Sequence, residues 1–401
     1  MKKVVAVIGG SASGIYFSLL LKEKHPEYDV ILIEKENKIG KKIYATGNGH
    51  CNCLNTKLSK ESFNDSKLVD IVLNKYSYTD LKDFFLKRGI LLKETEDGLV
   101  YPLSNSASSF VSLLEAELEK EGVRVLIKTR LLDYNDTEII VEKEGVRSFI
   151  KYDYLIIGAG GKSGKNLGSD GSVFDILKKH KYQITDLKPG LCPIKTKEVF
   201  KDIEGSRLKG RLEARDSNDV LLFREDGELL FKKDGISGIV AFNLSRVLAR
   251  TLGQIKIRFI PEPFLNDSFK NELSCIYNLK AESVLSSIYD PKISAYLSKK
   301  IAKLGLNFGN KDNFNRVFDE ISLFSLTYNC LYSFEESQIT IGGISSDFVG
   351  SKFNSKIEKN VYFIGEILDV DGKCGGFNLS WALLSAMLVS DNFWKKKVDY
   401  L

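Results

Sequence analysis

The sequence has no long apolar run and few cysteines, and each shortage narrows what the protein can be. No apolar run reaches the roughly 18 to 20 residues of a membrane span, and the opening run Val4–Ile8 is shorter than the core of a signal peptide. Six cysteines scattered over 401 residues do not suggest a disulfide framework. We therefore expect a cytoplasmic protein with reduced thiols and no membrane partner.

A metal centre also lacks its usual pattern, whereas the composition is that of an ordinary globular protein. His50, Cys51 and Cys53 lie close together, but no second pair of ligands with zinc-like spacing accompanies them, and the chain has only three histidines. We therefore expect no bound metal. Hydrophobic residues make up 43% and charged residues 28% of the sequence, which is typical of a folded chain with room for two or three domains.

The chain begins with a strand, a glycine turn and a helix. The apolar run Val4–Ile8 leads into Gly9-Gly10-Ser11-Ala12-Ser13-Gly14. The unpaired backbone N–H groups at such a helix start attract phosphate. A second apolar run ends at Glu34, 20 residues after Gly14, where an acidic residue binds a ribose hydroxyl in a dinucleotide fold. The pattern predicts an α/β protein with a Rossmann-like domain.

Ser11 departs from the usual motif, because it stands where the middle glycine lets the backbone approach a pyrophosphate. Its hydroxyl could bond a phosphate oxygen directly, or its side chain could hold the cofactor slightly away. We expect binding to survive this change, with a lowered affinity as the alternative.

Residues 35–56 form a loop rich in glycine and asparagine, which is suited to wrapping a large polar ligand. The segments Gly40-Lys41-Lys42 and Ala45-Thr46-Gly47-Asn48-Gly49-His50-Cys51-Asn52 closely resemble a signature of the bacterial HI0933-like flavoproteins. This family has two dinucleotide-binding domains and binds FAD. Its C-terminal signature recurs over residues 340–344 and 361–379. The resemblance is strong over residues 1–56 and 340–390 and thin over 196–324.

The resemblance implies FAD as the cofactor and a set of residues around it. These residues lie in the glycine turn, after the second strand, in the long loop, in a central glycine run and in the C-terminal signature: Gly9, Ser11, Ala12, Ser13, Gly14, Glu34, Lys35, Lys41, Lys42, Thr46, Gly47, Asn48, Gly49, Cys51, Asn52, Gly160, Gly365, Glu366, Gly375, Gly376, Phe377 and Asn378. It places Glu366 at the ribityl chain, and the helix that follows Gly376 can face the flavin ring and stabilise its reduced form.

Four residues differ from the family pattern. His50 and Leu99 stand where relatives have arginine, and Lys232-Lys233 stands where they have threonine and histidine. These differences weaken any substrate assignment taken from the family.

We expect a discontinuous FAD-binding domain over residues 1–190 and 325–401. Residues 191–324 would form an inserted substrate domain, with a β-barrel part over 191–260 and a helical part over 265–310. Strands over 123–128, 131–134, 138–143 and 148–151 would form a small additional β-sheet attached to the first domain.

No second nucleotide-binding motif follows the apolar run that ends at Ile157. Gly161-Lys162-Ser163 lacks the earlier glycine of a P-loop, because Ile156 occupies that position. A separate nicotinamide domain is therefore not predicted. NADPH or NADH would visit the flavin transiently, or the substrate would supply electrons that pass to oxygen.

Cysteine is the side chain that we consider first as a proton donor to a reduced substrate. Cys51 and Cys374 lie in the two signatures, so either could be a catalytic acid, with Tyr44 and His50 as lesser candidates; structurally inert cysteines are the alternative. His180, at the end of a predicted helix, is expected to cap or pack rather than to catalyse.

The family resemblance implies several reactions, namely reduction of a conjugated C=C bond, oxidation of a small amine and reduction of uridine in ribosomal RNA. Our leading hypothesis is an FAD-dependent oxidoreductase that transfers hydride between flavin N5 and an activated C=C or C–N bond. Structured RNA as the substrate and a non-catalytic redox module are the alternatives.

The charge of the inserted domain bears on the RNA alternative. Residues 191–324 carry 22 Lys and Arg against 18 Asp and Glu. Arg207, Lys209, Arg211 and Arg215 could face phosphates or simply be solvated. The sequence makes no prediction of oligomeric state.

Overall fold

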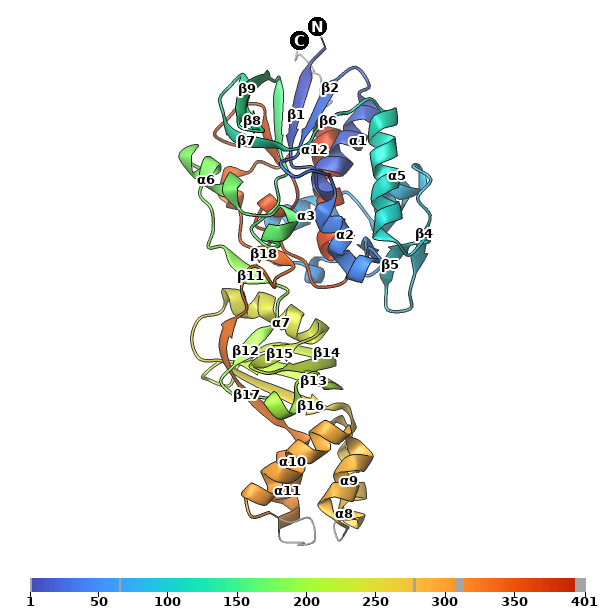
Figure 1. The fold of residues 1–401 in the computed structure, drawn as a ribbon, viewed down its shortest axis with the longest axis vertical. Coiled ribbons are helices and arrows are strands. Elements are labelled where there is room, and N and C mark those ends of the chain that lie inside the picture. Colours follow the sequence, from blue (N-terminus) through green and yellow to red (C-terminus); the bar gives the residue numbers. More distant parts are fainter. Residues whose placement is uncertain (1, 65, 277–278, 307–312, 394–401) are drawn as a thin grey trace. The chain divides into compact units, whose positions relative to one another are not determined.

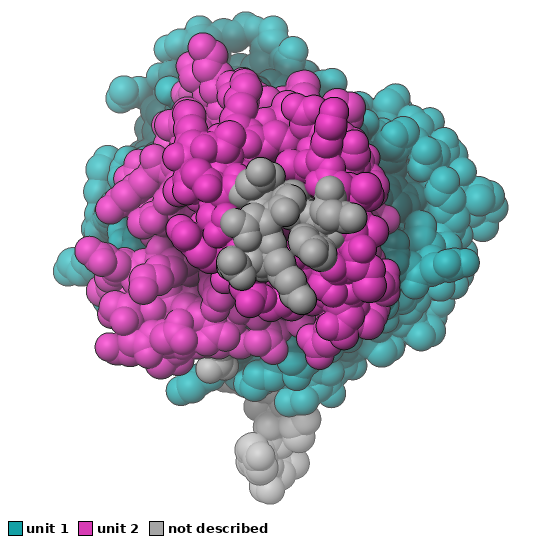
Figure 2. All heavy atoms as spheres, turned by 90° about the horizontal axis from the view of Figure 1, so that it is seen from below, with its two compact units in different colours: residues 1–188, 338–401 teal, residues 189–337 magenta. Residues whose placement is uncertain are grey.

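The computed structural model describes residues 2–64, 66–276, 279–306 and 313–393, and the chain divides into two units (Figure 1). Unit 1 comprises residues 1–188 and 338–401, and unit 2 comprises residues 189–337 (Figure 2). Each unit has its own cluster of buried apolar side chains. Of the described helices, none is long and apolar enough to cross a membrane.

Unit 1 is built on a five-stranded parallel sheet. Its strands follow the order β19, β10, β1, β2, β6. Their bounds are β19 Val361–Phe363, β10 Tyr154–Ile157, β1 Val4–Ile8, β2 Asp29–Ile33 and β6 Arg124–Leu126. The central strands are almost continuously buried, as expected for a parallel sheet covered on both faces. The register aligns Ile8 with both Ile33 and Ile157, so these three strands end at one edge.

Three long helices accompany this sheet: α1 Ala12–Lys24, α5 Ala107–Lys120 and α12 Phe377–Asn392. Helix α12 packs along α1, although the two are far apart in the sequence (Figure 1). The fold predicted from the first fifty residues is therefore confirmed, and both ends of the chain contribute to it.

Smaller elements of unit 1 surround the sheet. An antiparallel sheet has the order β3, β5, β4, and another has the order β7, β8, β9. The bounds are α2 Lys41–Ala45, β3 Leu54–Asn55, α3 Lys67–Leu73, α4 Tyr78–Leu86, β4 Leu92–Glu94, β5 Leu99–Pro102, β7 Thr129–Tyr134, β8 Glu138–Lys143, β9 Val146–Lys151, α6 Ser172–Lys179 and β18 Ile339–Ile341.

The prediction of a small additional β-sheet over residues 123–151 needs one correction. Residues 124–126 form β6, which pairs in parallel with residues 31–33 of the main sheet. Only β7, β8 and β9 form the small additional sheet, which is antiparallel. A short apolar run cannot reveal its partner strand, because that partner lies about ninety residues away.

Unit 2 contains a closed barrel with the strand order β12, β15, β14, β13, β16, β17. The bounds of its elements and of the preceding strand are β11 Lys188–Gly190, β12 Ile194–Thr196, β13 Arg207–Arg215, β14 Leu221–Lys232, β15 Gly235–Ser237, α7 Ile239–Arg250, β16 Lys256–Pro261, α8 Asp267–Cys275, α9 Ala281–Ile288, α10 Pro291–Lys303, α11 Phe314–Ser322 and β17 Phe324–Leu331. The predicted combination of barrel and helices is thus present.

The boundary expected at residue 325 differs from the structure. Strand β17 closes the barrel by pairing with β12 and β16, so residues 325–337 belong to unit 2. Such closure depends on partners far along the chain, which local composition does not reveal. Residues 277–278 and 307–310 of the expected helical part, and residues 394–401 of the expected C-terminal part, lie outside the described residues.

Candidate functional site

The glycine turn after β1 brings the chain tightly into α1. Gly9 has a φ of 105°, and a Cβ at Gly14 would lie 2.0 Å from the carbonyl oxygen of Gly9. Ser11 is the N-cap of α1, but its side chain accepts no capping hydrogen bond, and the first turn holds no acidic residue. The first turn of α1 therefore presents backbone N–H groups that suit an anion.

Glu34, directly after β2, lies beside this turn. Its Oε2 accepts a hydrogen bond from the Gly10 N–H at 2.8 Å, and its Oε1 accepts one from the Glu36 N–H at 2.8 Å. Burial raises the pKa of Glu34, although both backbone hydrogen bonds oppose that change. The carboxylate is held at the position where a dinucleotide fold binds a ribose hydroxyl.

A cleft opens between the glycine turn, the end of β2, the start of β7 and the segment that leads into α6. Seven of the predicted cofactor residues line it: Gly9, Ser11, Glu34, Lys35, Lys41, Lys42 and Gly160. Asp170 also lines the cleft and pairs with Lys35 at 2.6 Å. Sequence analysis missed Asp170, although a glycine on each side of Ser169-Asp170 marks a turn before a helix.

Glu366 lies where three segments of unit 1 meet. Its Oε2 accepts a hydrogen bond from Lys42 Nζ at 2.7 Å, and its Oε1 accepts one from the Thr340 N–H at 2.8 Å. A Cβ at Gly161 would approach that Oε1 to 3.1 Å. A Cβ at Gly365 would approach Ser13 Oγ of α1 to 2.6 Å. Glu366 is thus fixed between α2, the glycine run after β10 and β18.

The predicted residues Gly375, Gly376, Phe377 and Asn378 lie at a second place and are not part of the lining of this cleft. Asn55 Nδ2 donates to the Gly375 carbonyl at 2.8 Å, and a Cβ at Gly376 would lie 2.3 Å from the carbonyl oxygen of Leu54 and 2.8 Å from Asn52 Oδ1. Asn378 accepts from the Gly372 N–H at 2.8 Å and donates back to the Gly372 carbonyl at 3.0 Å. The start of α12 is therefore packed on β3.

The loop before β3 holds the other predicted residues. Gly47 and Asn48 have φ angles of 55° and 52°, and Thr46 Oγ1 donates to the Ile43 carbonyl at 2.7 Å. A Cβ at Gly47 would lie 2.9 Å from the Asn52 nitrogen. Residues 46–49 thus fold back on Asn52 but do not line the cleft.

The two candidate cysteines have different surroundings. Cys51 has 0% of its surface exposed and a φ of 60°, and burial together with a hydrogen bond between the two thiols raises the pKa of Cys53. Cys374 is half-buried, and burial and the neighbouring Cys374 raise the pKa of Tyr101. Of the two candidates, Cys374 has surface that a substrate can touch.

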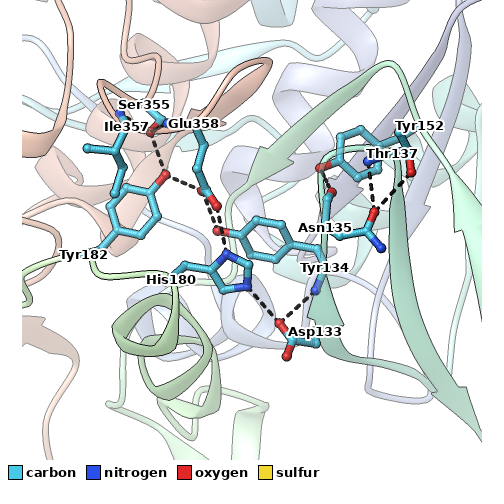
Figure 3. A network of polar contacts seen from close by, with 10 residues as sticks. All are labelled: Asp133, Tyr134, Asn135, Thr137, Tyr152, His180, Tyr182, Ser355, Ile357 and Glu358. Atoms are coloured by element: carbon cyan, nitrogen blue, oxygen red, sulfur yellow. Dashed lines mark hydrogen bonds and ion pairs between the residues drawn. The ribbon is translucent and has the colours of Figure 1, made fainter.

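None of the three histidines lines the cleft. His50 Nδ1 is 3.0 Å from the Asn105 carbonyl oxygen, and His25 is buried at the end of α1. His180 follows α6 and contacts two carboxylates (Figure 3). The described residues contain no group of three or more His, Cys, Asp or Glu that could hold a metal ion.

The residues at these two places fit FAD, a cofactor that the structure does not contain. The turn before α1 has N–H donors and space close to the backbone, Glu34 could supply a ribose acceptor, and Lys42 could supply a cation. The start of α12 has a left-handed Gly376 as its N-cap and no side chain capping it, so its first N–H groups are available to a ligand.

Comparison with known proteins identifies the class. The sequence matches the HI0933-like protein Rossmann domain over residues 3–392. It is 28% identical over 402 residues to 3-dehydro-bile acid delta(4,6)-reductase of Clostridium scindens, covering 96% of this chain and 97% of that protein. It is 25% identical over 403 residues to ribosomal RNA dihydrouridine synthase of Haemophilus influenzae, covering 95% and 96%.

A solved structure supports the fold. The 3-ketosteroid-delta4-(5alpha)-dehydrogenase of Rhodococcus jostii, in complex with 4-androstene-3,17-dione, has a TM-score of 0.52 at 10% identity, covering 97% of each chain. Fold, cleft and relatives together define an oxidoreductase that depends on FAD. More particularly, the chain belongs to the HI0933-like family.

Proposed function

We propose that the protein uses FAD to reduce an activated C=C bond of a small molecule, with a C–N bond as the alternative target. The observation that carries the proposal is the packing of the Gly375-Gly376 turn on β3 and against Leu99 of β5, which brings both signature regions of the chain to one place. The relative from Clostridium scindens is named as a reductase of the delta(4,6) positions of a 3-dehydro-bile acid, which supports the same class of reaction here.

Each part of the site would have a separate role. The turn from Gly9 to Gly14 would bind the pyrophosphate, and Glu34 would bind a ribose hydroxyl. Lys42 and Glu366, paired at 2.7 Å, would contact the chain between pyrophosphate and flavin. The start of α12 would face the ring with its positive dipole end. The other residues that the sequence predicts as contacts remain part of this proposal.

Bound FAD would supply a hydride equivalent at N5, so the protein must deliver a proton to the other carbon of the double bond. We assign this step to Cys374, because it is half-buried whereas Cys51 has no exposed surface. Tyr101, beside Cys374, is the second candidate. The reductant would be NADPH or NADH visiting transiently, and the predicted cytoplasmic location would supply both.

The test begins with the absorbance spectrum of the purified protein and anaerobic addition of NADPH and NADH. A flavin spectrum that is bleached by a nicotinamide and restored by a 3-oxo-4,6-diene steroid acid, with a product two mass units heavier, is the expected result. Restoration by no candidate acceptor would favour the non-catalytic redox module, and a protein that rejects added FAD would overturn the proposal.

The role of Cys374 is tested with a matched pair of variants. We expect Cys374→Ser to keep its FAD and lose about 100-fold or more in turnover, because a positioned acid contributes at least that much. Cys275→Ser, which changes an exposed cysteine of unit 2, should keep both FAD and turnover. Equal turnover in the two variants would mean that Cys374 is not the proton donor. Tyr101 would then be the next candidate, and Tyr101→Phe would test it.

Ribosomal RNA is the alternative substrate, since a relative at 25% identity is named as an RNA dihydrouridine synthase. The arginines that we considered for phosphate binding are paired with carboxylates. Arg207 Nη1 lies 2.5 Å from Glu228, and Arg211 Nε lies 2.7 Å from Asp226. Because these pairs neutralise both arginines, we rank RNA below a small molecule. Reoxidation of the flavin by RNA, but not by a steroid acid, would reverse that order.

A further inference from the structure

One wall of the cleft is made by two elements that must stay together. Residues 129–131 at the start of β7 line the cleft, and so do residues 171–174 at the start of α6. Any movement of α6 away from β7 therefore changes the shape of the cleft. Polar contacts join the two elements at both ends of α6.

The first contact lies at the start of α6 and centres on Asp170. Its carboxylate pairs with Lys35 at 2.6 Å and with Arg130 of β7 at 3.5 Å, and it accepts a hydrogen bond from the Ser172 N–H at 3.0 Å. Burial would raise the pKa of Asp170, but its hydrogen bonds to Lys35 and Ser172 outweigh burial and lower it. Asp170 thus remains charged throughout the neutral range.

The second contact lies at the end of α6 and centres on His180 (Figure 3). Its Nε2 lies 2.8 Å from Asp133 Oδ1 of β7, and its Nδ1 lies 2.8 Å from Glu358 Oε1. Its ring is stacked on that of Tyr134, with the ring centres 3.8 Å apart and the planes at 12°. One imidazole therefore joins α6 to β7 and to the segment that precedes β19.

Both ring nitrogens of His180 face carboxylate oxygens, and only the protonated ring can donate from both. Apart from Asp136, the other groups around this site are neutral or basic. The Tyr134 and Tyr182 hydroxyls donate to Glu358 Oε2 at 2.8 and 2.5 Å, and Lys179 is the neighbouring charge on α6. Burial and the negative charges of Glu358 and Asp136 raise the pKa of Tyr152. A neutral ring would leave one carboxylate without its donor.

We propose that His180 is a positioning residue that makes retention of the cofactor depend on pH. Its imidazolium holds α6 against β7 as the far end of an α6–β7 clamp, formed by Arg130, Asp133, Asp170, His180 and Glu358. Loss of the proton releases the end of α6 and loosens the cleft wall. The inference rests on the proposed placement of FAD in this cleft.

The direction of the pH dependence follows from the contacts. Burial alone would lower the pKa of His180, but the hydrogen bonds to Asp133 and Glu358 outweigh it and raise the pKa above 6.5. A raised pKa in the folded protein means that the clamp contributes fully below the ordinary histidine pKa and is lost as the pH rises through the higher value. FAD should therefore dissociate faster on the alkaline side.

The experiment measures the rate at which the holoprotein releases FAD between pH 6 and pH 9, from the fluorescence of the freed cofactor. We expect the wild-type rate to rise at least about threefold over this range. His180→Gln should release FAD rapidly at every pH. His180→Arg, which keeps a positive charge at this position, should release it slowly at every pH. His25→Gln, which changes a histidine outside the cleft lining, should keep the wild-type profile.

A second readout does not depend on FAD. The chain has three histidines, so the imidazole NMR signals of the apoprotein can be assigned with the variants His180→Gln and His25→Gln. The signal of His180 should titrate above the ordinary pKa of histidine. A pH-independent release rate in the wild type, or a wild-type profile in His180→Gln, would overturn the clamp. Failure to bind FAD at all would instead overturn the proposed function.

Discussion

Charged residues are used differently in the two units. In unit 1, Lys35, Lys41 and Lys42 each meet a carboxylate at 2.6 to 2.7 Å, and all of these side chains are mostly buried around one cleft. In unit 2, Arg207 and Arg211 of β13 meet carboxylates of β14, and their pairs lie largely in solvent.

Ion pairs therefore have two different roles in the two units. The Lys42–Glu366 pair joins residues 324 positions apart, and so it helps to define a site. The Arg211–Asp226 pair joins two neighbouring strands at opposite positions of a register that backbone hydrogen bonds already define. Exposed pairs are screened by water and contribute little to stability. Substitutions in the two units should therefore have different consequences, and matched variants can test this.

The largest effect is expected from Gly14→Ala and Gly235→Ala. A Cβ at Gly14 would lie 2.0 Å from the Gly9 oxygen, and one at Gly235 would lie 2.0 Å from the Ile194 oxygen. Because backbone must move in both cases, each change should lower the free energy of unfolding by about 2 to 4 kcal/mol. Thermal unfolding and the flavin content of the folded fraction measure the result. Only Gly14→Ala should lose FAD, and loss of FAD in Gly235→Ala would contradict the comparison.

A smaller effect is expected from Asp391→Asn, with Asp226→Asn as its counterpart in unit 2. Burial would raise the pKa of Asp391, but hydrogen bonds from Lys24, Lys75 and Tyr76 outweigh it and lower the pKa to about 2. At pH 7 the change should cost about 1 to 3 kcal/mol, against less than about 1 kcal/mol for the exposed Asp226.

The Asp391 contribution also has a defined pH dependence. A lowered pKa in the folded state means that the stabilisation is present above the ordinary value of 3.8 and is lost as the pH falls toward about 2. Urea unfolding at pH 7 and pH 3 measures this, and the difference between wild type and Asp391→Asn should shrink at pH 3. An equal cost for both aspartates at pH 7 would remove the distinction between the units.

The smallest effect on free energy is expected from Glu34→Gln. The amide can accept only one of the two backbone hydrogen bonds that the carboxylate accepts from Gly10 and Glu36. We expect the dissociation constant of FAD to rise about tenfold, equivalent to about 1.4 kcal/mol. Titration of the apoprotein with FAD measures it. Glu228→Gln in the barrel is the control, and any comparable weakening there would contradict our assignment of the cleft.

The sequence predicted the parts of the molecule that depend on local contacts. The strand, glycine turn, helix and Glu34 follow one another within 34 residues, and the fold class and the FAD-dependent class inferred with the family resemblance are confirmed. The cofactor contacts and the catalytic cysteine remain predictions. The family resemblance predicted that Cys51 lies near the flavin, but the burial of Cys51 next to Cys53 could not be read from spacing.

The features that the sequence did not reveal depend on distant partners. The contact between His180 and Asp133 joins residues 47 positions apart, and that between His180 and Glu358 joins residues 178 apart. Strand β17 has no local pattern that assigns it to the barrel, since its partners β12 and β16 begin at Ile194 and Lys256. Ion pairs and barrel closure depend on contacts between residues that are far apart in the sequence, and such contacts cannot be read directly from a single sequence.

The insertion of unit 2 into unit 1 has a consequence for biosynthesis. Residues 189–337 form one uninterrupted stretch with a closed barrel, whereas the parallel sheet receives β19 only after that stretch has been made. Domains generally fold as they leave the ribosome. The barrel can therefore be complete while unit 1 still exposes the edge of β10, so a nascent chain stalled before residue 361 should depend most strongly on chaperones.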